Sequence, residues 1–342
     1  MRFLTIATAA CVLTAGTAVA REAGATTYML ASLDGGPNLV WEYTNNGVVW
    51  NAITGSNTNV TQIAAIGNQL CMVASNDGAP NDVWCYTGNG TQWVSLGINA
   101  KMSVEGVAGE NSIYALGTFN GEYYVWNTPD VYSDWTQLGS PHTLAQSVIE
   151  SYTTPYLWAT SGSPLPNPGP FEIWQYTWGL DWTQVTGNAT NVYQLAGSSG
   201  YVYAIANVGS SSDPNTPPPG VWRYDGSGQL WTEITGPSTY IAGLGNSSPP
   251  LTSAQGVAYM LASNTSGGPY RVFQYSGSGT NWALITGTNT QTSWLMGTGS
   301  HVYQWAHNDG DINRLWQYTG SGTNWASLTG QGTSVVQVAE TD

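Results

Sequence analysis

Basic side chains are the scarcest class in this sequence. The 342 residues include only six Lys or Arg against 20 Asp or Glu, so the formal net charge is −14 and only 8% of residues are charged. Binding to nucleic acid or to an anionic membrane surface depends on clustered basic side chains. We therefore expect neither nucleic acid nor a membrane surface as a partner, whereas an uncharged hydrogen-bonding surface suits neutral ligands such as sugars.

Long apolar runs are also lacking after the first 20 residues, which excludes a membrane-spanning helix of the usual length. Residues 1–20 have the pattern of a secretory signal peptide, with Arg2, an apolar stretch and the small-residue cleavage pattern that ends at Ala20. We expect residues 21–342 to form the mature, secreted chain. A lipid anchor on Cys11 is the alternative, although the apolar region before this cysteine is short for it.

Cysteine is too rare to hold the fold together. Without the leader only Cys71 and Cys85 remain, and one disulfide cannot be the scaffold of so long a chain. The core must be apolar and aromatic, and the sequence contains 17 Trp and 20 Tyr against four Phe. Both Trp and Tyr combine a large apolar body with a polar tip, so they suit half-exposed sheets and binding surfaces.

The tryptophans recur in two columns. The first column consists of Trp41, Trp84, Trp126, Trp174, Trp222, Phe273 and Trp316. The second column consists of Trp50, Trp93, Trp135, Trp182, Trp231, Trp282 and Trp325. Successive copies lie 42 to 51 residues apart, which is the length of a four-stranded propeller blade.

Each copy contains four short runs rich in β-branched and aromatic residues, separated by Gly, Asn, Asp, Ser and Pro, and none keeps a helical period. We predict an all-β, seven-bladed propeller of four-stranded antiparallel blades in one domain. The segment that begins near Val60 is predicted as the innermost strand of the following blade. The C-terminal run Val335 to Ala339 is then the innermost strand of the first blade, which closes the ring by pairing the chain's two ends.

Three features interrupt the repeat. Two Pro- and Ser-rich insertions, at 163–170 and 210–219, are predicted as surface loops because the repeat resumes in register after each. In the second copy, Cys71 replaces the Tyr that precedes each Trp pair and Cys85 replaces a polar residue. These positions are expected on adjacent strands, which favours a disulfide in an exported protein over two buried thiols.

The unit Trp-x-Tyr-Thr-Gly, followed by Trp-x-x-Ile-Thr-Gly and an alternating Val-x-x-Ile segment, resembles the tectonin-type propeller repeat. It is most similar to that of the bacterial seven-bladed propeller lectins that bind fucose and O-methylated sugars. The resemblance covers about residues 26 to 342. It implies a non-enzymatic, multivalent, secreted carbohydrate-binding protein whose partners are glycans and which needs no cofactor.

The repeat also offers residues for a sugar site. An indole can stack on the C–H face of a sugar while amides and carboxylates bind its hydroxyls, so we place sugar sites in the grooves between blades. The expected aromatic platforms are Trp50, Trp182, Trp231, Trp282 and Trp325. The expected polar partners come from the residue that follows each first-column Trp, and they are Glu42, Gln175, Arg223, Gln274 and Gln317. The competing interpretation is that the Trp columns pack the blades and the polar column is merely solvated.

Catalytic and metal-binding patterns are weak. His301 and His307 flank one predicted strand, but ordinary surface histidines explain them better than a metal pair. No metalloprotease, serine-hydrolase or phosphate-loop spacing occurs. The alternatives to a lectin are a glycan-active enzyme, with carboxylates that converge from different blades, and a protein-binding or adhesion propeller. Outside the columns, Trp158 and Trp305 are predicted in the core, and Trp178 and Tyr270 are predicted to be exposed.

Overall fold

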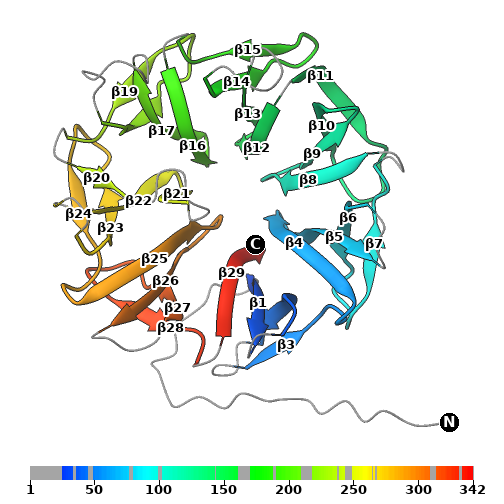
Figure 1. Ribbon diagram of the computed structural model, residues 1–342, viewed down its shortest axis with the longest axis horizontal. Helices are drawn as coiled ribbons and strands as arrows, with labels where there is room; N and C mark the ends of the chain where they lie inside the picture. The colour runs from blue at the N-terminus through cyan, green and yellow to red at the C-terminus, as the bar shows by residue number, and fades with distance from the viewer. Residues whose placement is uncertain are drawn as a thin grey trace.

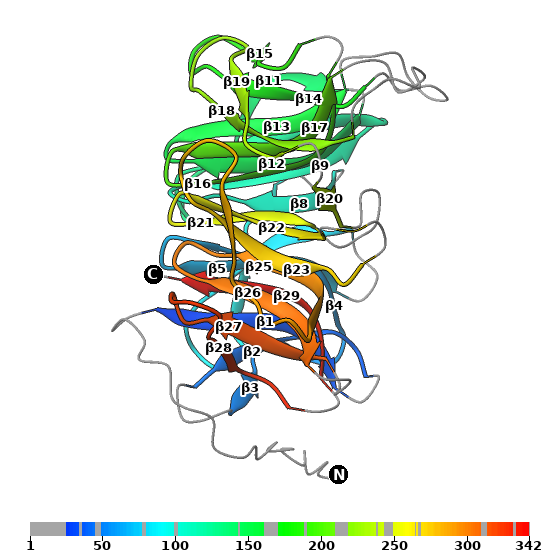
Figure 2. The ribbon, with the colours of Figure 1, turned by 90° about the vertical axis from the view of Figure 1, so that its left-hand side faces the viewer.

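The seven copies fold into seven antiparallel sheets arranged as blades around one axis (Figure 1). Seen from the side, the sheets form one ring with strands that cross its thickness (Figure 2). The computed structural model describes residues 25–341 except 34–35, 45–48, 77–79, 99–101, 143, 161–169, 188–189, 209–217, 237–238, 243–248, 264, 266–267, 309–312 and 331–332. We number the blades 1 to 7 by their Trp copy. The predicted seven-bladed propeller is confirmed.

Each blade contributes one strand to each of four concentric positions. The innermost strands are β29 (Thr333–Thr341), β4 (Thr58–Ile66), β8 (Ser103–Ala108), β12 (Leu144–Ser151), β16 (Thr190–Ser198), the short pair β20 (Tyr240–Ile241) and β21 (Leu251–Ala254), and β25 (Thr290–Gly297). The second strands are β1 (Thr26–Leu33), β5 (Gln69–Asn76), β9 (Ile113–Phe119), β13 (Thr154–Thr160), β17 (Tyr201–Val208), β22 (Val257–Ser263) and β26 (Val302–Asn308).

The outer half of each blade consists of a hairpin that carries both Trp columns. Its third strands are β2 (Leu39–Tyr43), β6 (Asp82–Tyr86), β10 (Glu122–Thr128), β14 (Glu172–Tyr176), β18 (Gly220–Tyr224), β23 (Arg271–Tyr275) and β27 (Arg314–Tyr318). Its outermost strands are β3 (Trp50–Ala52), β7 (Trp93–Ser95), β11 (Thr136–His142), β15 (Trp182–Gln184), β19 (Trp231–Glu233), β24 (Trp282–Leu284) and β28 (Trp325–Ser327). Six of these edge strands have three residues, which offers little template for pairing with another chain.

The ring closes through the two ends of the chain. Strand β29 pairs antiparallel with β1, from Thr26 opposite Thr341 to Leu33 opposite Thr333, and completes the sheet of blade 1 (Figure 1). This is the closure that the sequence predicts. No helix in the described part of the chain is long and apolar enough to cross a membrane.

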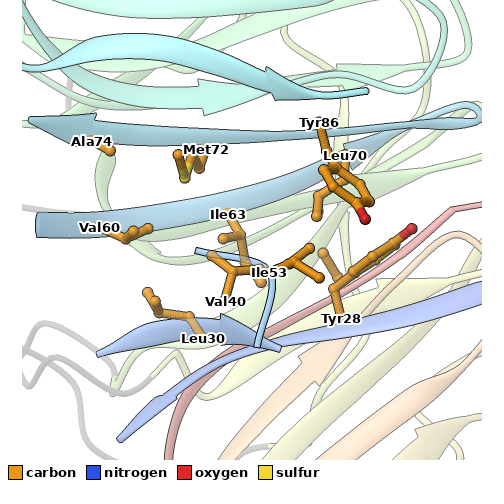
Figure 3. Packing of buried hydrophobic residues seen from close by; sticks show 11 residues of the cluster. Tyr28, Leu30, Val40, Ile53, Val60, Ile63, Leu70, Met72, Ala74 and Tyr86 are labelled. Carbon is orange, nitrogen blue, oxygen red and sulfur yellow. The ribbon is translucent and has the colours of Figure 1, made fainter. Parts of the chain in front are cut away.

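The apolar core is divided into layers that lie between neighbouring blades. In the layer between blades 1 and 2, Leu30, Val40 and Ile53 face Val60 and other side chains of blade 2 (Figure 3). The same strand alternation places one face of every sheet against the preceding blade and the other against the following blade. Each of the seven hydrophobic clusters has this two-blade composition.

Near the axis, glutamine side chains join neighbouring innermost strands. Gln62 of blade 2 donates from Nε2 to the carbonyl of Val107 in blade 3 (3.0 Å) and accepts from the N–H of the same residue (3.0 Å). Gln194 binds the backbone of Leu251 in the same two-bonded way, and Gln337 accepts a bond from the backbone of β4. Each of these glutamines follows a β-bulge in its strand, a feature that turns a side chain to a new direction.

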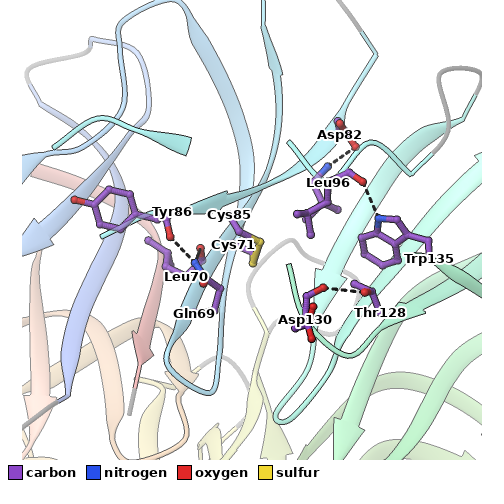
Figure 4. The surroundings of a disulfide bond; sticks show 11 residues. Gln69, Leu70, Cys71, Asp82, Cys85, Tyr86, Leu96, Thr128, Asp130 and Trp135 are labelled. Atoms are coloured by element: carbon purple, nitrogen blue, oxygen red, sulfur yellow. Dashed lines mark hydrogen bonds between the residues drawn. A yellow bond between two sulfur atoms is a disulfide. The ribbon is translucent and has the colours of Figure 1, made fainter. Parts of the chain in front are cut away.

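The two cysteines face each other on β5 and β6 of blade 2 and are joined by a disulfide (Figure 4). Their Cα atoms are 4.1 Å apart, the close spacing of a directly opposed, non-hydrogen-bonded pair in an antiparallel ladder. Both residues are buried in the layer between blades 2 and 3. The bond therefore cross-links two strands of one blade inside an apolar layer.

The aromatic side chains outside the columns divide as follows. Trp158 and Trp305 pack against core clusters, as predicted, and Trp178 is exposed, also as predicted. The prediction for Tyr270 is wrong, because this side chain is half-buried against the cluster between blades 6 and 7. The residues predicted as a signal peptide and nearly all of the two predicted insertion loops lie outside the described residues.

Reduction of the disulfide is expected to lower the free energy of unfolding by about 3 kcal/mol, because the bond closes a loop of roughly 15 residues in the unfolded chain. Guanidinium denaturation with and without a thiol reductant measures the change. A Cys71→Ala/Cys85→Ala variant is the control, since reductant should leave its unfolding midpoint unchanged. An equal midpoint for the oxidised and reduced wild type would contradict the prediction.

Candidate functional site

The second Trp column joins each blade to the preceding one. In all seven copies the indole Nε1–H donates to a backbone carbonyl of the preceding blade. The donor–acceptor pairs are Trp50 to Leu328 (2.9 Å), Trp93 to Ile53 (2.8 Å), Trp135 to Leu96 (3.0 Å), Trp182 to Leu138 (3.1 Å), Trp231 to Val185 (2.7 Å), Trp282 to Ile234 (2.6 Å) and Trp325 to Ile285 (2.7 Å). Figure 4 shows the bond between Trp135 and Leu96.

The residues after each Trp complete this joint. In blade 5 the buried Ile234 supplies the carbonyl that accepts from Trp282, while its own N–H donates to Val221 of the third strand (2.9 Å). The hydroxyl of Thr235 accepts from the N–H of Val221 (2.9 Å). The recurring Trp-x-x-Ile-Thr-Gly motif thus forms a packing contact between neighbouring blades. All the indoles predicted as sugar platforms take part in this contact.

The polar column, formed by the residues that follow each first-column Trp, lies on the opposite face of each sheet from the second Trp column. Glu42 lies opposite Asn51, whereas Trp50 lies opposite Tyr43, so the carboxylate and the indole of one copy point to different faces of the sheet. The polar side chain of one blade therefore shares a groove with the Trp of the next blade. The expected platform and its polar partner cannot come from a single copy.

Two of the five polar-column residues contact other protein side chains. Gln175 accepts a hydrogen bond from the Tyr224 hydroxyl of the next blade (3.3 Å), and Arg223 lies 3.6 Å from the Asp225 carboxylate. Gln274 is half-buried, and Gln317 is almost wholly buried with no hydrogen-bond partner for Nε2 among the described residues.

Glu42 lies in the groove between blades 1 and 2. Its pKa is raised by burial. The neighbouring Tyr28 has its pKa raised to about 12, first by burial and then by the Glu42 charge. The Tyr28 ring meets that of Tyr86 edge-on, with centroids 6.3 Å apart. Burial and then the Glu42 charge raise the pKa of Tyr86 as well, so aromatic side chains from two blades lie near this carboxylate.

Two recesses occur at the same position of the repeat, one in blade 7 and one in blade 4. The recess of blade 7 has a volume of about 280 Å³, and both Trp columns line it together with the linker from blade 6 and residues of blade 7, namely Trp316, Trp325, Thr288, Asn289, Gln304 and Thr323. The recess of blade 4 measures about 250 Å³, and the corresponding residues are Trp174, Trp182, Ser140, Pro141, His142 and Asp181.

The two recesses include two of the predicted platforms, Trp182 and Trp325, but none of the predicted polar partners. Residues of the linker after β24 in blade 7's recess, and residues at the end of β11 in blade 4's recess, take their place, and the Trp repeat alone does not indicate them. Asn289 and His142 occupy equivalent positions in the repeat. Each lies four residues after the residue whose carbonyl accepts from the next blade's Trp, Ile285 for Asn289 and Leu138 for His142. The fixed offset from the Trp motif is the signal that could have identified them.

Charge distinguishes the two recesses. In blade 4 the Asp181 carboxylate accepts from the N–H and the hydroxyl of Ser140 (3.0 and 2.8 Å) and from the N–H of Trp182 (2.8 Å). The Ser140 N–H is the largest of several influences that hold the pKa of Asp181 below its ordinary value. Burial lowers the pKa of His142, against opposing effects of a hydrogen bond to the Thr160 backbone and of the Asp181 charge. The recess of blade 7 is lined by neutral side chains.

The side chains of Ser140, His142 and Asp181 do not form a nucleophilic triad. The Ser140 hydroxyl donates directly to Asp181 (2.8 Å), whereas an activated serine needs its base, the histidine, as hydrogen-bond partner.

Carboxylates do gather at one set of hairpins in blades 3 to 5. Glu150 accepts from the N–H groups of Glu110 (2.6 Å) and Asn111 (2.7 Å). Glu110 in turn accepts from the N–H groups of Tyr152 (2.7 Å) and Ser199 (2.9 Å). These bonds to backbone amides brace three blades against one another.

The histidines considered for a metal have other surroundings. His301 lies 2.9 Å from Glu340 of the closing strand, and His307 is half-buried. No group of three or more metal-ligating side chains occurs among the residues that the structure describes.

No protein-family model matches this sequence, and no curated protein is significantly similar to it. Solved structures share the fold. The β-propeller domain of the Trilobed protease from Pyrococcus furiosus is similar with a TM-score of 0.67 and 11% identity, over 91% of this chain and 96% of that one. Its topology is described as open velcro, whereas β29 and β1 pair here.

Two further neighbours are longer chains. Puromycin hydrolase has a TM-score of 0.70 at 11% identity over 93% of this chain, and the Pyrococcus horikoshii acylaminoacyl peptidase has 0.63 at 10% identity over 90%. The match covers 53% and 51% of those chains, so this chain spans about half their length. Identities this low show the propeller fold alone, and these neighbours give no support to the resemblance to lectins.

Replacement of Trp231 by Phe keeps an aromatic ring at the joint but removes the N–H that binds Val185. We expect the free energy of unfolding to fall by about 1 to 3 kcal/mol, because a carbonyl in the packed joint loses its partner. Thermal and guanidinium denaturation measure the change. Trp178→Phe is the matched control on an exposed indole and should shift stability by no more than about 0.5 kcal/mol. Equal effects of the two substitutions would contradict a role for the Trp231 bond.

The lowered pKa of His142 predicts a pH-dependent stability. In the unfolded chain this histidine takes up a proton near its ordinary pKa of 6.5, whereas the folded state resists protonation. Its contribution is therefore present above that pH and is lost as the pH falls from about 6.5 towards the lowered folded pKa. Urea unfolding of the wild type and of His142→Gln at pH 7.5 and pH 5 should show the wild type losing stability relative to the variant. A constant difference between the two proteins would exclude this contribution.

Proposed function

We propose that this protein is a non-enzymatic, secreted carbohydrate-binding propeller whose sugar sites lie in the grooves between blades. The observation that supports this is the recess of blade 7, where two indoles stand among neutral amide and hydroxyl side chains. The face of an indole carries negative partial charge and attracts the weakly positive C–H groups of a sugar. Asn289, Gln304, Thr288 and Thr323 offer donors and acceptors for the hydroxyls around it.

The platform is already in place before a ligand arrives. Trp325 is oriented by its bond to Ile285 (2.7 Å), and Trp316 by a bond from its Nε1 to the Ala306 carbonyl (3.1 Å). A site whose side chains are held by other contacts loses little conformational entropy on binding, so even a shallow recess can bind a small neutral ligand.

The propeller also favours weak binding at several places. The same Trp joint recurs at all seven junctions of the ring, and attachment to a glycan-coated surface through the grooves beside more than one of them would add avidity without any single tight site. Fucose and O-methylated sugars are the first candidates, since the repeat resembles that of lectins that bind them. We propose fewer than seven working sites, because the residues at the recess positions differ between copies of the repeat.

Asn289→Ala tests the site without touching a Trp joint, because the side chain is exposed on the linker. A glycan array with the purified wild type identifies a neutral sugar, and titration of that sugar measures the affinity. We expect the variant to bind about three- to tenfold more weakly, the loss of one or two hydrogen bonds. Asn68→Ala, at an exposed hairpin turn of blade 2, is the control and should bind like the wild type. A folded wild type that binds no glycan would overturn the proposal, and a protein partner captured regardless of free sugar would favour an adhesion propeller.

A further inference from the structure

The recess of blade 4 departs from its neutral counterpart in a way that specifies a different ligand. We propose that it binds a positively charged ammonium group, held against Trp174 and Trp182 and neutralised by Asp181. This goes beyond the proposed sugar site, because it concerns another blade and another chemical class of ligand. The two proposals can fail independently.

Aromatic rings form the walls of this recess. Trp174, Trp182 and His142 line it, and the His142 ring lies 5.2 Å from that of Trp174 and 6.1 Å from that of Trp182, in both cases edge-on. Tyr176 does not line the recess, but its ring packs against Trp182 with centroids 5.2 Å apart. An ammonium group within about 6 Å of an indole centroid is attracted by the negative ring face, and Trp is the best of the aromatic residues for this contact. A volume of about 250 Å³ is ample for a trimethylammonium group.

One carboxylate gives the recess its charge. Asp181 stays ionised because the hydrogen bonds from Ser140 and Trp182 hold its pKa below the ordinary value, whereas burial favours the neutral form of His142. A carboxylate offers about four lone-pair positions, of which these three bonds use three. In blade 7, Asn289 takes the place of His142 and Asn324 that of Asp181, so the same repeat position carries no charge there.

The position of the carboxylate depends on one glycine. Gly139 has a φ of 60°, and a Cβ at this residue would overlap both the Asp181 carboxylate and the Trp182 indole. Because Gly139 has no side chain, the backbone of blade 3 can lie close enough for Ser140 to bind Asp181, which is also bound by the N–H of Trp182. A metal ion is a poor alternative occupant, since His142 and Asp181 are the only metal-ligating side chains among the described residues that line this recess, and metal sites of proteins use more.

Choline chloride is the probe, and 3,3-dimethylbutan-1-ol is the uncharged molecule of the same shape. Isothermal titration of the full mature protein at pH 7.5, with intrinsic Trp fluorescence as a second readout, should show choline binding at least tenfold more tightly than the alcohol. Equal affinities, or no binding of choline, would overturn the proposal. This comparison uses only the wild type, so it decides the question even where a variant folds poorly.

Asp181→Asn keeps an oxygen acceptor for the N–H groups while it removes the charge, and we expect choline affinity to fall at least tenfold. Asp134→Asn is the matched control, because Asp134 is an exposed carboxylate that directly precedes the outer Trp of blade 3 just as Asp181 precedes that of blade 4. It should bind choline within twofold of the wild type, and so should Asn289→Ala. Retained choline affinity in Asp181→Asn, or an equal loss in Asp134→Asn, would show that this recess does not hold the ammonium group.

Discussion

The hydrogen bond from an indole N–H to a carbonyl of the preceding blade is the interaction on which the rest of this structure depends. It occurs at every one of the seven junctions, and because the ring is closed no junction is left as an end. The bond sets the distance and rotation between neighbouring sheets at the rim, where the blades splay. Tryptophan suits this position because Phe has no donor, and Tyr places its donor at the tip of the ring.

Near the axis the blades are joined by different chemistry. Glutamine side chains after β-bulges bind the backbone of the next innermost strand, as Gln62 does with Val107. Neighbouring blades are thus joined by Trp hydrogen bonds at the rim and by Gln hydrogen bonds near the axis. Between the two, apolar side chains fill the layer between the blades. Residues that line the recesses but supply neither the indole N–H nor its carbonyl acceptor can differ between blades. His142, at the end of β11, and Asp181, in the turn between β14 and β15, are such residues, so the recess of blade 4 holds a carboxylate that the recess of blade 7 lacks.

The architecture could be predicted from the sequence because its causes are local and repeated. Trp spacing, strand alternation and the unpaired C-terminal run were sufficient for the blade count, the strand order and the closure. The candidate site was harder, because each recess combines residues from two copies. Alternation shows that Glu42 and Trp50 occupy opposite faces, but not which neighbour each face meets. Asp181 reaches Ser140 across 41 residues, and no spacing within a copy indicates that contact.

Closure by the last strand has a consequence for how the protein folds during its synthesis. Strand β1 ends at Leu33 and its partner β29 begins at Thr333, so 300 residues of synthesis separate the two. At ribosomal rates of about 5 to 20 residues per second, the first blade waits roughly 15 to 60 seconds for its final strand. During that interval β1 is an unpaired edge with an apolar face, the kind of surface that chaperones protect. The first blade to be made is the last to be finished.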